Sequence, residues 1–165
     1  ERIAGLIKDG EIVVNMFGGV GMFSLLAAKD TVCTVYNIDI NPIAAQLCKE
    51  NARINKLKGE VISLNGDATE IINEKLLDKA DRVLMLLPER SDEFLDSALL
   101  ALKKEGIIHY YSHMHAEKKQ DSPKLSEEHF MDVIKTNAKI LASKNVRPVG
   151  PRFYQTVVDV KISKD

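Results

Sequence analysis

The fold is decided by the stretch Ile12-Val-Val-Asn-Met-Phe-Gly-Gly-Val-Gly-Met-Phe23, which is followed by Val32-Cys-Thr-Val-Tyr-Asn-Ile-Asp39. An apolar run ends in a glycine turn, an apolar helix follows, and a second apolar run closes on an acid. This is the layout of a nucleotide-binding βαβ unit, because glycines let the backbone approach a ligand closely and the acid accepts hydrogen bonds from a ribose.

The spacing of the glycines separates this turn from the dinucleotide-binding type. A GxGxxG pattern would need glycines at positions 19, 21 and 24, and position 24 is a serine. The turn instead carries Gly18, Gly19 and Gly21 between two phenylalanines, Phe17 and Phe23. This favours a methyltransferase-type turn, where adenosine and a sulfonium amino acid bind and no pyrophosphate requires a helix N-terminus.

Length and composition predict one domain, residues 1–165. A chain of 165 residues with 45% hydrophobic content can bury one core, and its net charge of -1 by itself indicates neither a nucleic-acid nor a membrane partner. No apolar stretch approaches the roughly 20 residues that span a bilayer, and no signal-peptide pattern is present. Two cysteines, Cys33 and Cys48, indicate buried thiols in a reducing cytoplasm. The chain enters at Glu1 in what resembles the middle of a helix, so we expect a domain cut from a longer protein.

Strands and helices alternate with short breaks, which predicts a doubly wound α/β sheet that is mostly parallel. After the fifth strand we expect two helices and a hairpin, whose last strand pairs antiparallel at the sheet edge. This completes a seven-stranded, Rossmann-like class I methyltransferase sheet. Asn41, Ser91 and Ser126 are expected as N-caps, and residues 114–125 as a loop. The expected strands are 11–17, 32–38, 60–65, 81–87, 106–112 and 154–162, and the expected helices are 21–29, 42–55, 68–77, 91–103 and 126–143.

Ligands bind beyond the C-terminal ends of the strands in such a sheet. Four segments lie there: Phe17–Gly21, Asp39–Ile40, Asn65–Ala68 and Leu86–Arg90. The first three together predict an S-adenosylmethionine site. The backbone of the glycine turn faces the amino-acid portion, Asp39 takes both ribose hydroxyls, Ile40 packs on adenine, and Asp67 accepts from the adenine amino group.

Other interpretations of these residues stay open. The pair Gly18-Gly19 is also compatible with a plain tight turn, and Asp39 with a cap of the helix at 42–55 or a solvated strand end. Asp67 is equally suited to cap the helix at 68–77.

The four histidines do not indicate a metal site. His109, His113 and His115 are close in sequence, but zinc needs convergent ligands with supporting hydrogen bonds, so no metal is expected. GxSxG is absent, and covalent catalysis has no support.

Several blocks that are spread over nearly the whole chain form a recognisable set. They are Asn15–Phe23, Asn37–Pro42, Glu50–Lys56, Asp81–Pro88, Ile107–Tyr111 and the closing segment Tyr154-Gln-Thr-Val-Val-Asp159. In this order they resemble the tRNA (guanine-37 N1) methyltransferase family of archaea and eukaryotes. They resemble its sibling, the wybutosine-pathway tRNA aminocarboxypropyltransferase, nearly as well.

The resemblance implies a set of site residues. It places Leu86, Leu87 and Pro88 against the target guanine, where the methyltransferases commonly show Asn-Leu-Pro. Leu86 therefore lacks the amide that would hold the base edge, although the backbone carbonyls remain. Asn15 and Met22 likewise stand where the family usually has Asp and often has Pro. The residues implied to hold S-adenosylmethionine are Phe17, Gly19, Gly21, Asp39, Ile40, Asp67 and Ala68.

The reaction implied by the resemblance needs a general base, because guanine N1 carries a proton at neutral pH. The family's proposed base is an acid just before the first strand, in an Arg-containing segment. This chain begins there with Glu1-Arg2, so Glu1 is a candidate, and a base upstream of residue 1 is favoured over it. Three functions stay open: methyl transfer to N1 of guanine 37, aminocarboxypropyl transfer to a modified tRNA guanine, and a cofactor-binding module without catalysis.

The implied partner is tRNA, contacted at its anticodon loop by a monomer that acts in the cytoplasm without metal or membrane. Between residues 116 and 152 there are eight Lys or Arg against five Asp or Glu. This mild basic bias suits phosphate contacts, and a solvated helix face explains it equally well. The family places much of its tRNA recognition in extra N-terminal domains, which we do not expect within these residues.

Overall fold

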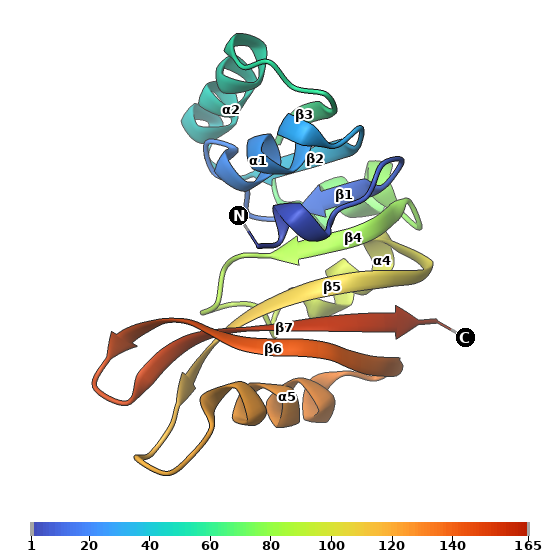
Figure 1. The fold of residues 1–165 in the computed structure, drawn as a ribbon. Coiled ribbons are helices and arrows are strands. Elements are labelled where there is room, and N and C mark those ends of the chain that lie inside the picture. The colour runs from blue at the N-terminus through green and yellow to red at the C-terminus, as the bar shows by residue number, and fades with distance from the viewer. Residues whose placement is uncertain (1, 165) are drawn as a thin grey trace.

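Seven strands form one sheet in the order β3-β2-β1-β4-β5-β7-β6 in the computed structural model, which describes residues 2–164. The strands β1 to β5 run parallel to one another, and β7 is antiparallel to both of its neighbours, as Figure 1 shows. The expected doubly wound, mostly parallel seven-stranded sheet is confirmed. The strands are β1 Ile12–Asn15, β2 Thr34–Asp39, β3 Glu60–Asn65, β4 Ala80–Met85, β5 Leu102–His115, β6 Asn137–Gly150 and β7 Phe153–Ser163.

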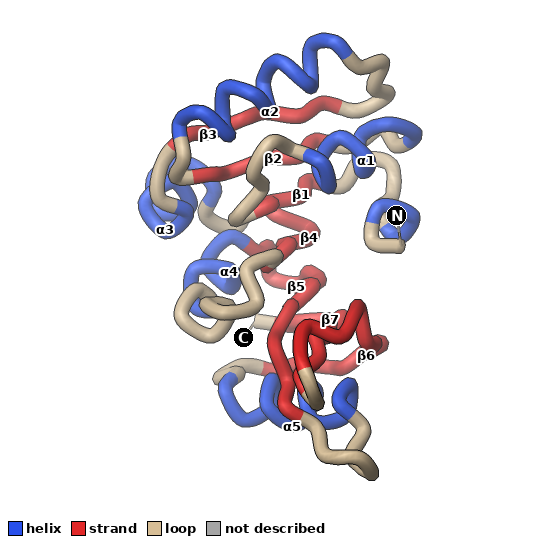
Figure 2. The backbone as a smooth tube through the Cα atoms, turned by 90° about the vertical axis from the view of Figure 1, so that its left-hand side faces the viewer, coloured by secondary structure: helices blue, strands red, loops and turns tan. Residues whose placement is uncertain are grey.

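Helices cover both faces of this sheet. Seen along the sheet in Figure 2, α3 and α4 lie on one side, and α1 with the N-terminal segment lies on the other. The segment that resembled the middle of a helix contains one short 3-10 turn, η1, at Ala4–Leu6. None of the helices within residues 2–164 is long and apolar enough to cross a membrane. The helices are α1 Met22–Asp30, α2 Pro42–Ile54, α3 Ala68–Ile71 with a following π turn η2 at Ile72–Leu76, α4 Leu95–Ala101 and α5 Ser122–Val133.

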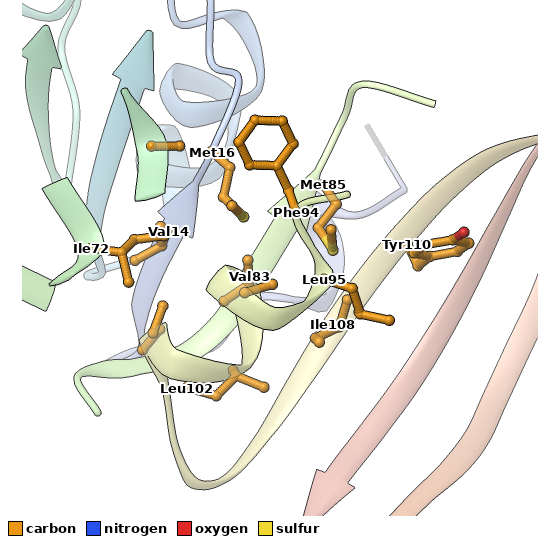
Figure 3. Close-up of a cluster of buried hydrophobic side chains, with 14 of the residues drawn as sticks. Val14, Met16, Ile72, Val83, Met85, Phe94, Leu95, Leu102, Ile108 and Tyr110 are labelled. Carbon is orange, nitrogen blue, oxygen red and sulfur yellow. The ribbon is translucent and has the colours of Figure 1, made fainter. Parts of the chain in front are cut away.

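The larger core lies between the sheet and the layer formed by α3, α4 and α5. Figure 3 shows Val14, Val83 and Ile108, from three adjacent strands, packed with Leu95 of α4. Phe130 of α5 extends this core beneath β5 and β7. A smaller core on the opposite face joins the N-terminal segment and α1 to the sheet. Burial of these side chains is the main stabilising contribution and holds the strand ends in place.

Two of the predicted helices have different boundaries. The helix expected at 91–103 is confined to α4, Leu95–Ala101, and Lys103-Lys104 belong to β5. Ser91 does not cap it, since its hydroxyl donates to the carbonyl of Leu87 at 3.0 Å. Residues 114–125 are not one loop, because β5 continues to His115 and α5 begins at Ser122.

The helix expected at 126–143 is wrong in its second half. The N-cap of α5 is Asp121 rather than Ser126, and the helix ends at Val133. Residues 137–150 form β6, in which Ala138 and Ile140 pack on the core while Lys139 between them is exposed. This alternation has the strand period of two, and pairing with β7 decides in its favour.

The position of the last strand is also corrected. The prediction placed it at the sheet edge, whereas β7 lies between β5 and β6, and β6 is the edge strand. One helix, α5, rather than two lies between β5 and the β6–β7 hairpin. The antiparallel direction of β7 is confirmed.

Candidate functional site

A cavity of about 290 Å³ lies at the C-terminal ends of β1, β2, β3 and β4. Small-molecule sites occupy about 300–1,000 Å³, so this one is at the lower end of that range. All four segments that the sequence places beyond the strand ends contribute to it. The lining residues are Met16, Phe17, Gly19, Asp39, Ile40, Gly66, Asp67, Ala68, Leu86, Leu87, Arg90 and Phe94.

Asp39 connects the glycine turn to the end of β2 by a hydrogen bond. Its Oδ2 accepts a hydrogen bond of 2.7 Å from the amide of Gly19, and its Oδ1 accepts one of 2.9 Å from the amide of Asn41. Asp39 does not cap α2, because the N-cap is Asn41, whose side chain accepts from Ile43 at 3.0 Å. Each carboxylate oxygen retains capacity for a further donor, since a carboxylate offers about four lone-pair sites.

Asn37 explains why the turn begins with a glycine at position 18. Its amide nitrogen donates to the carbonyl of Gly19 at 3.2 Å. A β-carbon added at Gly18 would overlap the amide group of Asn37, so a side chain there would displace the turn. Sequence reasoning missed Asn37, although a polar residue inside the apolar run of β2 was the available signal.

Asn15 and Ser24 complete a buried polar group beneath the turn. Ser24 Oγ donates to Asn37 Oδ1 at 2.6 Å, and the amide nitrogen of Asn15 reaches Ser24 Oγ at 3.1 Å. Among the described residues, Asn15 Oδ1 is the one buried side-chain atom that has no hydrogen-bond partner. Asn15 is therefore part of the support of the turn.

Gly21 does not line the cavity. It precedes α1 with a φ of 90°, a conformation that side chains rarely adopt. A β-carbon there would lie 2.5 Å from Cys48 Sγ, so Gly21 allows α1 to pack against α2. The structure thus gives Gly21 a supporting position behind the turn.

At the end of β3, Asp67 has the capping geometry that the sequence left open. Its Oδ1 accepts from the amides of Thr69 at 2.8 Å and Glu70 at 3.2 Å, as the N-cap of α3. No bond to its Oδ2 is found within residues 2–164, and Asp67 lines the cavity, so capping and ligand contact are compatible. Ile40, at 72% exposure, presents an apolar surface to the same cavity.

The residues that follow β4 line two different hollows. Leu86 and Leu87 line the cavity, whereas Pro88 lines a separate hollow beside Tyr110. Phe94 closes the cavity from the start of α4, with its ring edge-on to Phe17 at 4.9 Å between centroids. Sequence reasoning missed Phe94 and Met16, because isolated apolar residues carry no chemical signature.

The charges around the cavity are two carboxylates, Asp39 and Asp67, and one guanidinium, Arg90. The Arg90 guanidinium lies 4.9 Å from the centroid of the Phe94 ring and pairs with Glu93 at 2.6 Å. The cavity therefore combines an apolar wall with an excess of negative charge. This donor and acceptor set fits a molecule that has hydroxyls, a flat apolar ring and a cationic centre.

The histidines lie apart from this cavity. No group of three or more potential metal ligands occurs among the described residues. His109 is fully buried in β5 between Asp159 and Arg82. His129 pairs with Asp92 at 2.9 Å at the surface. Glu1, the candidate general base, lies outside the described residues.

Comparison with known proteins identifies a family and several relatives. The sequence pattern of the family described as "TRM5/TYW2 methyltransferase domain" matches residues 1–140. The tRNA 4-demethylwyosine(37)-methyltransferase Taw21 of Saccharolobus solfataricus is 37% identical over 97% of this chain and 58% of its own length. The tRNA (guanine(37)-N(1))-methyltransferase Trm5b of Methanocaldococcus jannaschii is 36% identical over 99% of this chain and 44% of its own length. This chain spans about half the length of these curated relatives.

A third relative and two solved structures extend the comparison. The tRNA(Phe) (4-demethylwyosine(37)-C(7)) aminocarboxypropyltransferase of M. jannaschii is 32% identical over 99% of this chain and 65% of its own. M. jannaschii Trm5 in complex with adenosine superposes with a TM-score of 0.81 at 32% identity, over 99% of this chain and 48% of that one. M. jannaschii TYW2 in complex with AdoMet superposes with a TM-score of 0.79 at 29% identity, over 99% and 74%.

Proposed function

This chain belongs to the TRM5/TYW2 methyltransferase domain family, and from that premise we propose that its cavity binds S-adenosylmethionine for the modification of guanine 37 in tRNA. The observation that carries the proposal is Asp39, which is fixed by Gly19 and Asn41 at the rim of the cavity. A carboxylate that is held by backbone amides and lines the cavity can accept from two adjacent ribose hydroxyls.

The remaining cavity residues supply the rest of the cofactor site. Ile40 and Ala68 offer apolar contact to the adenine ring, and Asp67 Oδ2 accepts from its amino group. Phe17 and the backbone at Gly19 face the amino-acid portion. When bound, S-adenosylmethionine supplies an activated carbon next to a sulfonium, so the chain's own task is positioning.

The target base is expected at the other end of the cavity, against Leu86 and Leu87. We assign the carbonyl oxygen of Leu86 as an acceptor for the base edge, because that of Leu87 already accepts from the amide of Arg90 and the hydroxyl of Ser91, each at 3.0 Å. The two leucine side chains exclude water from the reacting atoms. Removal of the proton from guanine N1 requires a base. Glu1 stays a candidate for it.

Methyl transfer to N1 of guanine 37 is the activity we favour, because the relative Trm5b is named for that reaction. Taw21 is also named as a methyltransferase at position 37, but with 4-demethylwyosine as the base. Aminocarboxypropyl transfer to a modified guanine is the second candidate. It is supported by Leu86, since a site without an amide at this position is less suited to holding the edge of an unmodified guanine. With tRNA as substrate we place the activity in the cytoplasm, where Cys33 and Cys48 stay reduced.

Mass analysis of tRNA decides between these activities. The protein is incubated with S-adenosylmethionine and either unmodified tRNA or tRNA that carries 4-demethylwyosine. We expect a gain of one methyl group at position 37 of the unmodified tRNA. A gain of the heavier aminocarboxypropyl group on the second substrate would favour the sibling activity. If calorimetry shows that the cofactor binds but neither tRNA gains a group, the third candidate, a cofactor-binding module without catalysis, is supported.

A further inference from the structure

The β6–β7 hairpin has one covered face and one that faces a groove. On the covered face, Asn145 accepts from Ser122 of α5 at 2.7 Å, and Thr156 bonds to Ser126 of α5 at 3.0 Å. Paired residues of neighbouring strands point to the same side of a sheet. Lys144 pairs with Val157, so its side chain belongs to the face away from α5.

Two adjoining hollows form a groove on that face, which we call the β6 groove. One has a volume of about 460 Å³ and the other about 290 Å³, and both are lined by Arg2 and Lys144. The N-terminal segment from Arg2 to Lys8 forms one wall, and β6 forms the other. Tyr111 and Val157, from β5 and β7, lie in the floor.

Basic residues outnumber acids along β6 and β7. Residues 137–163 contain five Lys or Arg and one acid, Asp159, although Arg152 pairs with Glu117 and Lys161 with Glu105. Glu11 also lines the groove and pairs with Arg82. Asp159 is 4% exposed and already bonded to Arg2 and His109, so it offers no counter-charge at the surface. Within residues 2–164, no carboxylate lies within 4.0 Å of the ammonium groups of Lys8 or Lys144. These positive charges are therefore available to an anionic partner.

The hairpin also carries an aromatic surface at its tip. Phe153 is 43% exposed and lies 5.5 Å from the ring of His115, between centroids, at the paired ends of β7 and β5. Arg147 lies between this tip and Lys144. It is opposite Gln155 in the register of β6 and β7, and Gln155 is two residues from Val157, so Arg147 lies on the same face as Lys144. Basic groups interleaved with exposed aromatic rings are typical of surfaces that follow a nucleic-acid strand.

The hairpin extends toward the same end of the sheet as the candidate cofactor cavity. The last β5 residue paired with β4 is Tyr110, opposite Met85, and β5 runs on with β7 to His115. Figure 1 shows the hairpin tip projecting on the side where the arrows of β1 and β4 end. A strand bound along the β6 groove would therefore pass near the end of the sheet where the cavity opens.

We propose that the β6 groove binds the sugar-phosphate backbone of the RNA substrate, with Lys144 and Arg147 as phosphate contacts. The inference rests on the proposed function, since it assigns a surface to the tRNA of that reaction. It assigns the binding of the RNA backbone to a surface outside the cofactor cavity. Phosphate contacts of this kind orient a substrate and carry no base specificity.

The test measures the affinity for a fluorescein-labelled, unmodified anticodon stem-loop RNA by anisotropy across a series of salt concentrations. For Lys144→Ala/Arg147→Ala we expect affinity about tenfold lower, with the slope of log affinity against log salt shallower by about two. The matched control, Lys49→Ala/Lys75→Ala, removes two exposed lysines of α2 and η2 that do not line the β6 groove, and it should bind RNA as the wild-type chain does.

Calorimetry with S-adenosylmethionine separates this proposal from the proposed function. The groove variant should retain the cofactor affinity of the unmodified chain. Equal RNA affinity and salt slope in the groove variant and the unmodified chain would overturn the groove assignment and leave the cofactor cavity standing. Absence of salt-dependent RNA binding by the unmodified chain would overturn it too and would direct attention to a protein segment as occupant.

Discussion

Asp159 and His109 are joined by a hydrogen bond of 2.6 Å between Oδ1 and Nδ1, in the middle of the paired strands β7 and β5. The other ring nitrogen of His109 lies 2.8 Å from Nη1 of Arg82. A guanidinium can only donate, so Nε2 accepts and the proton resides on Nδ1. Burial lowers the pKa of His109, which agrees with a neutral ring.

This pair is the centre of a buried polar chain that crosses the sheet. Arg82 is held by Glu11 at 2.9 Å, and Asp159 is held on its other side by Arg2 at 2.5 Å. Burial alone would raise the pKa of Asp159, but the hydrogen bonds from His109 and Arg2 outweigh it and lower the pKa to about 2. This series of buried hydrogen bonds connects the N-terminal segment to β4, β5 and β7.

Replacement of Asp159 should be strongly destabilising. Asp159→Ala leaves Arg2 without its partner and removes the acceptor of a fully buried ring N–H, and breaking a buried pair costs about 3–5 kcal/mol. Urea unfolding followed by circular dichroism measures the change. The control is Glu105→Ala, which removes the exposed pair with Lys161 and should leave the midpoint nearly unchanged. Equal effects of the two variants would contradict the role of the buried chain.

Acidification should weaken the fold in two steps. The pKa of His109 in the fold lies below its ordinary 6.5, so its contribution is present above pH 6.5 and is lost as the pH falls, because the unfolded chain binds the proton first. The contribution of Asp159 is present above about pH 3.8 and is lost as the pH falls toward 2. Unfolding free energies measured from pH 8 downward should show the first loss in the unmodified chain. A His109→Gln variant that shows the same loss would rule out His109 as its source.

Asp39→Ala should lower the affinity for S-adenosylmethionine at least tenfold. Two hydrogen bonds to a carboxylate are lost, and hydrogen bonds to charged groups contribute about 1.5–3 kcal/mol each. Isothermal calorimetry measures the affinity, with Asp30→Ala at the exposed end of α1 as control. Unchanged affinity in Asp39→Ala would remove this residue from the site.

Gly18→Ala should disrupt the glycine turn. The added methyl group overlaps the Asn37 amide, and Asn37 then loses its bond to the Gly19 carbonyl. We expect weaker cofactor binding together with a lower unfolding midpoint. Gly5→Ala is the matched control, because a β-carbon at Gly5 meets nothing within 4 Å. The contrary result would be a Gly18→Ala chain that binds and unfolds as the Gly5→Ala chain does.

The two roles of Asp67 can be separated by a pair of variants. Asp67→Ser retains an oxygen that caps α3 but removes the carboxylate, whereas Asp67→Ala removes both. We expect Asp67→Ser to keep its stability and to lose cofactor affinity, and Asp67→Ala to lose about 1 kcal/mol of stability as well. Calorimetry and thermal unfolding measure the two effects. Full affinity in Asp67→Ser would restrict Asp67 to capping.

The alternation of strands and helices and most of the cavity residues were accessible from the sequence because they depend on local patterns. The apolar run into Gly18-Gly19, the acid at Asp39 and the cap signature at Asn41-Pro42 are each encoded within a few residues. The helix expected at 126–143 failed for the opposite reason. Residues 137–143 satisfy both a helical and an alternating pattern, and the pairing of β6 with β7 selects the strand.

By itself, the sequence determined the βαβ layout, the parallel sheet and the end of the sheet at which the candidate cavity lies. These features follow from the period of apolar residues and the backbone demands of glycine, both of which are local. Only the tertiary structure decided that Phe94 closes the cavity, that Gly21 stands behind the turn and that His109 joins Asp159 and Arg82 across the sheet. Those contacts join residues far apart in the chain, and burial and hydrogen-bond geometry that exist only after folding select them.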